Sequence, residues 1–368
     1  MTSISRPATA PPRSLRGLTE SVARAPQTGL VAVLLVLATA LTLAAGSHVD
    51  RLSGASVNDF LNPHTLVQMA TDASGFAIMG VGATIVIIAG GIDLSVGAIY
   101  ALAGVAMAMV LRATGPMGDG ATVFVALATC LSVALLCGLA NGLMVIGLGV
   151  HPFIITLGTM WILRGIAFVI SRAESILVPQ ALTSVAKAKI GIGAELSPVP
   201  LLAMVGVAVF GWMYLERTVM GRHVFAVGGN PEASRYSGLA APRVKLGVYL
   251  ISALTAGIAA FIGAAFYGSA ASSDANGYEL YVIASAVVGG ASLAGGKGSA
   301  ISAMLGALLI VMIRQAIRTL HLDQNYEWII IGTAMIIAVV LDQSGTRLLA
   351  RRLTASAPTG AAPSASNP

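Results

Sequence analysis

Charge is what this sequence has least of: only 10% of its 368 residues are charged, against about 25% in a soluble domain. Aromatic residues make up 5% of the chain, whereas hydrophobic residues reach 56% and the mean hydropathy is +0.86. This composition excludes a large soluble domain and predicts a polytopic membrane protein. The net charge of +6 could suggest nucleic-acid binding. The basic residues lie mostly in short loops and tails beside apolar runs, however, where they act as topology determinants.

The chain also lacks the residue patterns of metal centres and of nucleophilic catalysis. Its two cysteines, Cys130 and Cys137, lie two turns apart in one apolar run, and we interpret them as small apolar residues. The five histidines show no metal-ligand spacing, and no nucleophile–base arrangement stands out. We therefore predict no metal, no cofactor and no enzymatic activity for this chain.

Apolar runs long enough to cross a membrane dominate what is present. A span needs about 20 mainly apolar residues, and about ten runs are recognisable, the eighth of them short. They lie near Leu30–Ala45, Val67–Ala89, Leu94–Leu111, Ala121–Leu148, Phe153–Ser171, Pro198–Leu215, Leu246–Phe266, Leu280–Val288, Ser299–Ile313 and Trp328–Leu341. The fold predicted is all-α and polytopic, with about ten transmembrane segments in a domain over residues 28–345. Residues 1–27 and 346–368 are polar or low in complexity and are predicted to be disordered tails.

Two glycine-rich breaks interrupt these runs. The first, Gly90–Gly97, carries a carboxylate, Asp93. Backbone groups freed at membrane depth must find partners, because hydrocarbon offers none, so this break is expected to be buried in protein or to line a watery path. Asp93 has two compatible interpretations: an N-cap of a helix that begins at Leu94, or a residue of a transport path.

The second break follows a run that is too short to cross alone. As a helix, Leu280–Val288 rises about 14 Å at ~1.5 Å per residue, so the glycine-rich stretch after it must complete the crossing. Gly289–Leu293 repeats the Gly-Gly and the Leu of Gly90–Leu94 at the same offsets. Paired glycine-interrupted segments in separate halves are typical of a transport path at a repeat interface, and we keep an internal repeat as a hypothesis.

Gly289–Ser299 superficially resembles a phosphate-binding loop. That pattern requires Ser or Thr after the lysine, whereas Gly298 follows Lys297 here, and Ala291 stands where the first glycine should be. We do not expect nucleotide binding, and we place Lys297 near the inner face. Arg164, about three turns into the fifth span, is expected to face protein, a partner or water and to have a structural pairing or capping role.

Charge predicts the orientation of the chain. The tail before the first span carries net +3, and the segment 216–245 carries five basic residues against Glu216 and Glu232, again net +3. With ten crossings, both regions and the basic C-terminal flank lie on one side, which assigns the N- and C-termini to the cytoplasm. Within 216–245, Asn230-Pro231 reads as the start of a short helix that Gly238 ends.

Four motifs, in order, carry a family resemblance. They are Gly90–Gly97 with Ala98 and Leu102; Phe153, Thr156, Leu157, Gly158 and Met160 with Arg164-Gly165; Val227–Ala233 with Ser237-Gly238; and Gly277–Leu280, Val288–Gly290, Ser292-Leu293 and Gly295–Ser299. Together they resemble the permease subunits of ribose/monosaccharide-type ABC importers, which are components of binding-protein-dependent transport systems of the bacterial inner membrane.

The resemblance implies an ATP-driven importer that moves a pentose or hexose between outward- and inward-facing states. Its implied partners are a second permease subunit (as a homo- or heterodimer), two cytoplasmic ATPase subunits that hydrolyse ATP and an extracytoplasmic sugar-binding protein. The implied ATPase-coupling residues are Gly229, Asn230, Pro231, Glu232, Ala233, Arg235 and Gly238. The expected translocation path and helix breaks comprise Gly90, Gly91, Asp93, Ser95, Gly97, Thr156, Gly289, Gly290 and Ser292.

One departure from the family and several alternatives stay open. After Glu279-Leu280 the family often has an acidic residue, whereas this chain has Tyr281, so the substrate does not transfer simply from the family. Within the importer class, the solute could be a branched-chain amino acid, a nucleoside or an autoinducer-type sugar derivative. A different class is an ion-coupled secondary transporter, with Asp93 as the coupling carboxylate. A membrane enzyme would need a catalytic cluster that the sequence does not display.

Overall fold

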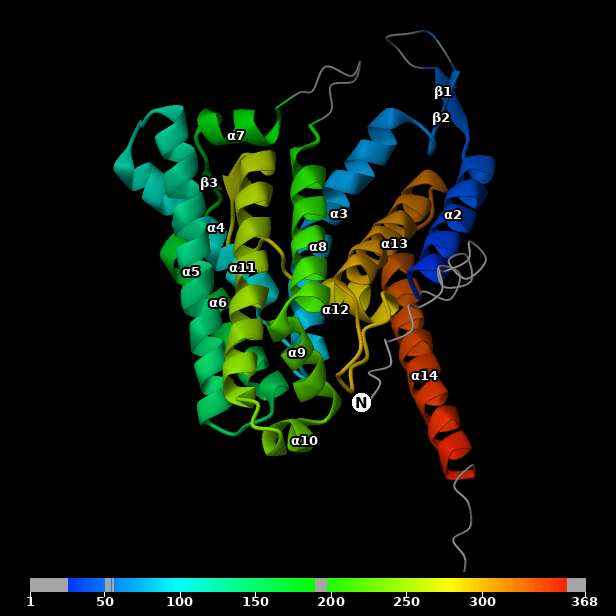
Figure 1. Cartoon of the computed structure of the whole chain (residues 1–368). Coiled ribbons are helices and arrows are strands. Elements are labelled where there is room, and N and C mark those ends of the chain that lie inside the picture. Colours follow the sequence, from blue (N-terminus) through cyan, green and yellow to red (C-terminus); the bar gives the residue numbers. More distant parts are fainter. Residues whose placement is uncertain (1–25, 50–53, 55, 189–196, 356–368) are drawn as a thin grey trace, which may run out of the picture.

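The computed structural model describes residues 26–49, 54, 56–188 and 197–355, and these residues form a bundle of helices (Figure 1). In chain order the helices are α2 (Pro26–Ala44), α3 (Pro63–Ile88), α4 (Val96–Thr114), α5 (Asp119–Gly147), α6 (Pro152–Ser171), α7 (Gln180–Ala186), α8 (Val199–Arg217), α9 (Val219–Gly229), α10 (Pro231–Tyr236), α11 (Ala241–Tyr267), α12 (Tyr278–Val288), α13 (Ala300–Thr319) and α14 (Tyr326–Ala355). Two short antiparallel strand pairs join them: β1 (Ser47–Val49) with β2 (Ser56–Asn58), and β3 (Ile176–Leu177) with β4 (Ser269–Ala270).

Every apolar run predicted from the sequence corresponds to a helix. Eight helices of the described chain are long and apolar enough to cross a membrane, and α12 and the apolar part of α14, Tyr326–Val340, are shorter. The all-α polytopic fold is therefore confirmed. The strands, α7 and α9 were not predicted, because each is too short or too polar to stand out as a span.

Prolines and polar caps decide where several helices begin. A proline occupies the first turn of α3, α6, α8, α10 and α11, where its missing N–H costs nothing. The side chain of Asn62 accepts from the N–H of Thr65 at 2.8 Å, and that of Thr218 accepts from Gly221 at 3.0 Å. These local signals separate helices that the apolar pattern alone would run together.

Helix α3 forms the centre of the bundle. Every residue from Phe76 to Ala89 is buried, and α8, α11, α12 and α13 pack around this helix. The outer helices α2, α5 and α6, and the face of α8 turned away from α3, instead expose large apolar side chains such as Leu43, Phe124 and Val169. Lipid tails are as apolar as leucine, so such surfaces suit contact with lipid or with another membrane subunit.

Small residues bring α5 close to α11. Gly138 and Gly142, four residues apart on α5, face α11, where a methyl group on Gly138 would lie 2.6 Å from Cβ of Ala253 and 2.9 Å from the carbonyl oxygen of Tyr249. Glycines at this spacing let two helix backbones approach closely, which replaces the missing hydrophobic driving force inside a membrane.

The two sides of the bundle differ (Figure 1). Helix α10 and the C-terminal end of α14 lie on one side, and α7 with the β1–β2 pair lies on the other. The predicted tail boundary at residue 346 is too early, because α14 continues to Ala355. Residues 1–25 and 356–368, which include most of both predicted tails, lie outside the described residues.

We expect Gly138→Leu to lower the free energy of unfolding by about 1–3 kcal/mol, because the new side chain must displace the backbone of α11. Thermal unfolding of the purified protein in detergent measures the effect. Gly206→Leu on α8 is the matched control, since nothing lies within 4 Å of its added Cβ, and this variant should unfold like the parent. Equal stability of the two variants would contradict the packing described here.

Candidate functional site

Both glycine-rich breaks begin with the same helix-ending turn. At the end of α3, Gly90 has φ +79°, Gly91 N donates to Val86 O at 3.0 Å and Gly90 N donates to Ile87 O at 2.9 Å. At the end of α12, Gly290 has φ +90°, Ala291 N donates to Ala286 O at 2.9 Å and Gly290 N donates to Val287 O at 2.8 Å. This pair of bonds is the Schellman motif, which needs a left-handed residue and therefore favours glycine.

The residues that correspond in the two breaks therefore differ by one position from those matched in the sequence. The letters pair Gly90 with Gly289, whereas the backbone pairs Gly90 with Gly290. Gly289 is instead the C-cap of α12, in a helical conformation, and a side chain there would contact the backbone of Ser302. The repeat hypothesis keeps local geometric support at the helix ends and loses the proposed one-to-one residue match.

A buried polar cluster holds the first break. Asp93 is 2% exposed, and its carboxylate accepts three hydrogen bonds: from Ser95 N (3.0 Å) and Ser95 Oγ (2.6 Å) to Oδ1, and from Ser252 Oγ (2.8 Å) to Oδ2. Asn141 Nδ2 donates to Ser95 Oγ at 2.7 Å. Asn141 belongs to α5 and Ser252 to α11, so the carboxylate ties the break to two spans.

The interpretation of Asp93 as the N-cap of a helix from Leu94 is wrong. Helix α4 begins at Val96, its N-cap is Ser95, and that cap makes no side-chain capping bond. Asp93 does accept a backbone N–H, but from Ser95 in a short turn before the helix. The hydroxyls of Ser95 and Ser252 donate hydrogen bonds to the carboxylate, which therefore lies in the polar cluster and not at the end of the helix.

Backbone groups of the first break find partners on neighbouring helices. The carbonyl oxygen of Ile92 accepts from Thr156 Oγ1 at 3.1 Å and from Tyr249 OH at 3.4 Å. Thr156 is fully buried, so its hydroxyl supports the break from α6. The expectation that freed backbone at membrane depth must be satisfied inside the protein is met here.

The second break is closed by its own backbone and by α3. Ser292 N donates to Lys297 O at 3.1 Å and Gly295 N donates to Ser292 O at 2.9 Å. Gly296 N then donates at 2.8 Å to Ile88 O, the last carbonyl of α3. The second break is therefore hydrogen-bonded to the end of α3, from which the first break leads on, and Ser292 is buried within the second break.

A third irregular segment, which sequence reasoning missed, precedes α12. The guanidinium of Arg164 donates from Nη1 to Ser272 O (2.8 Å) and Asp274 O (2.6 Å), and from Nη2 to Ala275 O (3.1 Å). Arg164 is 8% exposed, and Gly97 in the first turn of α4 packs against the same segment. The structural pairing role predicted for Arg164 is confirmed, with backbone carbonyls as its partners.

The predicted coupling residues form one exposed corner. Asn230 caps α10 by accepting from Ala233 N at 2.9 Å, and Pro231 stands in its first turn. Gly238, at φ +79°, follows the helix and donates to Arg235 O at 3.1 Å. The short helix predicted between Asn230 and Gly238 is thus confirmed. Glu232, Arg235 and Tyr236 are exposed on it, and the tyrosine is 83% exposed.

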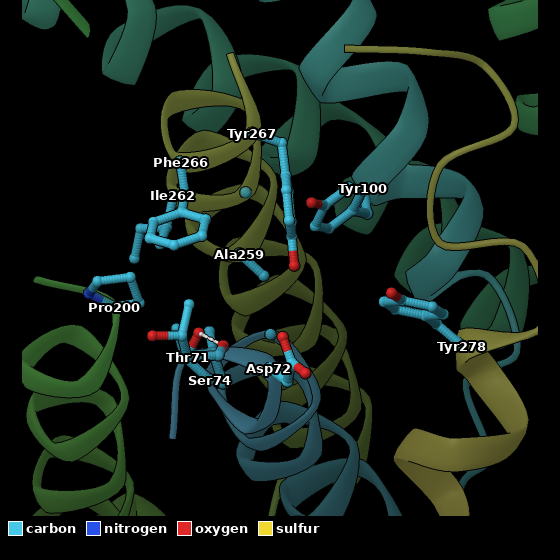
Figure 2. A pocket seen from close by; sticks show the side chains of 13 residues that line it. Thr71, Asp72, Ser74, Tyr100, Pro200, Ala259, Ile262, Phe266, Tyr267 and Tyr278 are labelled. Atoms are coloured by element: carbon cyan, nitrogen blue, oxygen red, sulfur yellow. Dashed lines mark hydrogen bonds between the residues drawn. The ribbon is translucent and has the colours of Figure 1, made fainter. Parts of the chain in front are cut away.

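Two hollows lie away from the breaks. One is a cavity of about 40 Å³ among α3, α4 and α11, around which Figure 2 shows Tyr100, Tyr267 and Asp72. A water molecule needs roughly 10–15 Å³ measured in this way, so this cavity has room for water and not for a sugar. A larger open hollow of about 530 Å³ lies between the α5–α6 connection and the first turns of α11, and His151 and Lys245 are among its lining residues.

The structure adds no metal-binding constellation to this picture. Among the residues it describes, no group of three or more His, Cys, Asp and Glu side chains is placed to hold a metal ion.

Comparison with known proteins identifies the family. Residues 65–339 match the model of the family described as "branched-chain amino acid transport system / permease component". The chain belongs to this family. The permease is also 37% identical to the D-allose transport system permease protein of Escherichia coli K12, over 77% of the chain and 85% of that protein.

Two further relatives extend the match. The ribose import permease protein of Escherichia coli K12 is 32% identical over 86% of the chain and 93% of its own length. An autoinducer 2 import system permease protein of Photorhabdus temperata is 30% identical over 76% of the chain and 83% of its own length. These matches confirm the resemblance and the transport function that the four motifs implied. The chain is a multi-pass permease of the inner membrane and a transport component, not an enzyme.

The sequence located both breaks, but it did not reveal the side chains that hydrogen-bond to them. Asn141, Tyr249 and Ser252, all outside the expected site, supply hydrogen bonds to the first break. The available signal was a polar side chain inside an otherwise apolar span, which marks an internal contact in a membrane protein. The sequence does not show which break such a side chain meets.

We expect Asp93→Asn to fold with a loss of about 1–3 kcal/mol in unfolding free energy, because the amide oxygen keeps part of the acceptor capacity. Asp93→Leu should lose clearly more, since the hydroxyls of Ser95 and Ser252 are then buried without their acceptor. Thermal unfolding in detergent gives both values, and the same pair of changes at the exposed Asp119 is the control. An equal loss in both Asp93 variants would mean that the charge itself is required.

Proposed function

We propose that the permease is the membrane subunit of an ATP-driven importer and forms the path for a monosaccharide. The similarity to the allose and ribose permeases, over more than 80% of the length of each, is the observation that carries this proposal. The described interior also suits it. The carboxylate of Asp93 and the guanidinium of Arg164 are both engaged with protein groups, which leaves hydroxyl and apolar groups for an uncharged solute.

A second permease subunit would complete the path. Leu280 on α12 and Leu293 in the second break are 52% and 41% exposed, and an apolar cluster joins Leu94 of the first break to side chains of α6, α12 and α14 such as Leu157 and Ile283. A surface of this kind next to both breaks suits a path between two subunits. Within one subunit, Gly90 and Gly290 are the exposed members of the expected path set, and Asp93, Ser95, Thr156 and Ser292 shape the breaks from inside.

Helix α10 would couple the permease to cytoplasmic ATPase subunits. It projects from one side of the bundle, and only Ser234 among its residues is buried (Figure 1). Its exposed face combines Glu232 and Arg235 with the ring of Tyr236, and tyrosine and arginine are enriched where a few residues dominate binding. This side carries the basic segment 216–245, so α10 and both termini are assigned to the cytoplasm, and an extracytoplasmic binding protein would deliver the sugar to the opposite side.

The family departure at Tyr281 does not argue for another solute. Tyr281 is buried, its hydroxyl donates to Glu327 Oε1 at 2.7 Å, and its ring lies 5.8 Å from that of Trp328. Arg314 Nε is 3.0 Å from the same carboxylate oxygen. The tyrosine therefore joins α12 to α14 and lies away from the exposed face beside the breaks. Autoinducer 2, named for one relative, and branched-chain amino acids, named for the family, are the solutes to compare with sugars.

Uptake by proteoliposomes tests this proposal. We expect labelled pentoses or hexoses to enter only when the permease, its cognate ATPase and its binding protein are all present with ATP. Autoinducer 2 and branched-chain amino acids serve as competing solutes in the same assay. Uptake by the permease alone, driven by an ion gradient and abolished by an uncoupler, would contradict it.

Glu232→Lys should weaken ATPase association at least tenfold without loss of folding, because it reverses an exposed charge on α10. Co-purification of the ATPase with the tagged permease measures the association. Glu174→Lys is the control, since it makes the same change at an exposed position in the connection after α6, beside β3. Unchanged co-purification of the Glu232→Lys variant would remove the coupling role from α10.

A further inference from the structure

Three segments that are far apart in the sequence meet with almost no side chain between them. They are the end of α3 with the first break, the end of α9, and the second break. The residues at the meeting point are Gly90, Gly228, Gly229, Gly295 and Gly296, and we call this group the glycine junction. Through Gly228 and Gly229 at the end of α9, the junction connects the two breaks to α10.

Gly228 is the tightest point of the junction. A methyl group there would collide with the carbonyl oxygen of Ile88, and it would lie 2.7 Å from that carbonyl carbon and 2.9 Å from the nitrogen of Gly296. All of these neighbours are backbone atoms, so no side-chain rotation can make room. The bond that a methyl group would disrupt, Gly296 N to Ile88 O at 2.8 Å, is the one that joins the second break to the end of α3.

The second break contributes a matching contact. A Cβ on Gly295 would lie 2.6 Å from Gly228 O and 3.2 Å from Cα of Gly90, and one on Gly296 would lie 2.7 Å from Cα of Gly229. Gly295 and Gly296 also have φ of +86° and +73°, which L side chains rarely adopt. The three backbones therefore touch directly, and the contact depends on both space and conformation.

The connection between the glycine junction and α10 is short and constrained by hydrogen bonds at both ends. Helix α9 ends at Gly229 and α10 begins at Pro231, so a single residue, Asn230, separates them. The N–H of Asn230 closes α9 on Ala226 O at 3.0 Å, and its side chain opens α10 by accepting from Ala233 N at 2.9 Å. With both helix ends fixed on one residue, α10 cannot move far without moving Gly228 and Gly229.

We propose that Gly228 and Gly296 are positioning residues for transport: their backbone contact passes a displacement of α10 to both glycine-rich breaks together. This inference rests on the proposed coupling role of α10 and assigns the route by which that coupling reaches the path. Close packing that serves only the stability of the fold would need the same glycines. The test must therefore measure whether the breaks move, and not only whether the protein stays folded.

Thiol labelling at the breaks gives that reading. Leu293→Cys places a reporter on an exposed position of the second break, and Ile92→Cys places one on a half-buried position of the first. The native Cys130 and Cys137 are buried, and the parent chain measures their background. The rate of alkylation is followed in the reconstituted complex with its ATPase, first without nucleotide and then with ATP and vanadate, which trap ADP and vanadate in the ATPase after hydrolysis.

In the otherwise native complex, we expect both reporters to change rate at least threefold and to do so with the same dependence on ATP concentration. In Gly228→Ala, the ATPase should still co-purify and hydrolyse ATP, while the rate change at Leu293→Cys falls below 1.5-fold and uptake drops at least tenfold. Gly247→Ala on α11, where nothing lies within 4 Å of the added Cβ, is the control and should behave like the native complex.

A full rate change in Gly228→Ala would overturn the inference. If that variant cannot be purified, the Leu293→Cys and Ile92→Cys reporters in a chain with the native glycine junction provide the test. A rate change at one break without the other, or rate changes with different midpoints in ATP concentration, also overturns the inference. Loss of ATPase co-purification from the native complex would instead contradict the proposed coupling role, so the two failures are distinguishable.

Discussion

The need to satisfy backbone hydrogen bonds at membrane depth governs this permease. Where α3 and α12 stop inside the bundle, the freed N–H and C=O groups find no hydrogen-bond partner in lipid. Each unpaired group would cost several kcal/mol. The chain answers with three different partners: a Schellman turn at each helix end, hydroxyls from Thr156 and Tyr249 on Ile92 O, and the guanidinium of Arg164 on three carbonyls before α12. The hydroxyls of Thr156 and Tyr249 and the guanidinium of Arg164 are therefore committed to the backbone.

That commitment explains the heavy use of glycine, 42 residues in all. The second break can satisfy the end of α3 only if the two backbones approach to hydrogen-bond distance, as at Gly296 N and Ile88 O. Any side chain at Gly228 would hold the two apart. Glycine costs conformational entropy on folding, and inside a soluble helix bundle that cost would favour alanine. Here the alternative is an unpaired carbonyl in hydrocarbon, which costs more, so glycine is retained at the contact.

Much of the fold could be predicted because its signals are local. Apolar length located ten helices, eight of them long and apolar enough to cross a membrane, and the Asn-Pro start and the glycine stop located α10 to within two residues. The site was predicted less well because its partners are not local: Ser252 reaches Asp93 from 159 residues away along the chain, and Asn141 reaches Ser95 from 46 residues away. The match between the two breaks was read one residue out of register, since letters match Gly-Gly to Gly-Gly, whereas the turn is fixed by which glycine is left-handed. Tertiary contacts decided the partners of the first break, and local backbone conformation decided the register of the two turns.

The same contacts limit what a solute can meet. Asp93 and Arg164 have the charge to bind an ion, yet each is buried and engaged, so moving either toward a solute would expose backbone or hydroxyl groups that it now satisfies. A transporter that used them for ion coupling would have to rebuild the breaks in every cycle. An importer driven by separate ATPases needs no such rearrangement, because the work enters from outside through α10 and leaves the polar clusters whole. The arrangement of hydrogen bonds therefore favours displacement of intact breaks over their unfolding as the basis of transport.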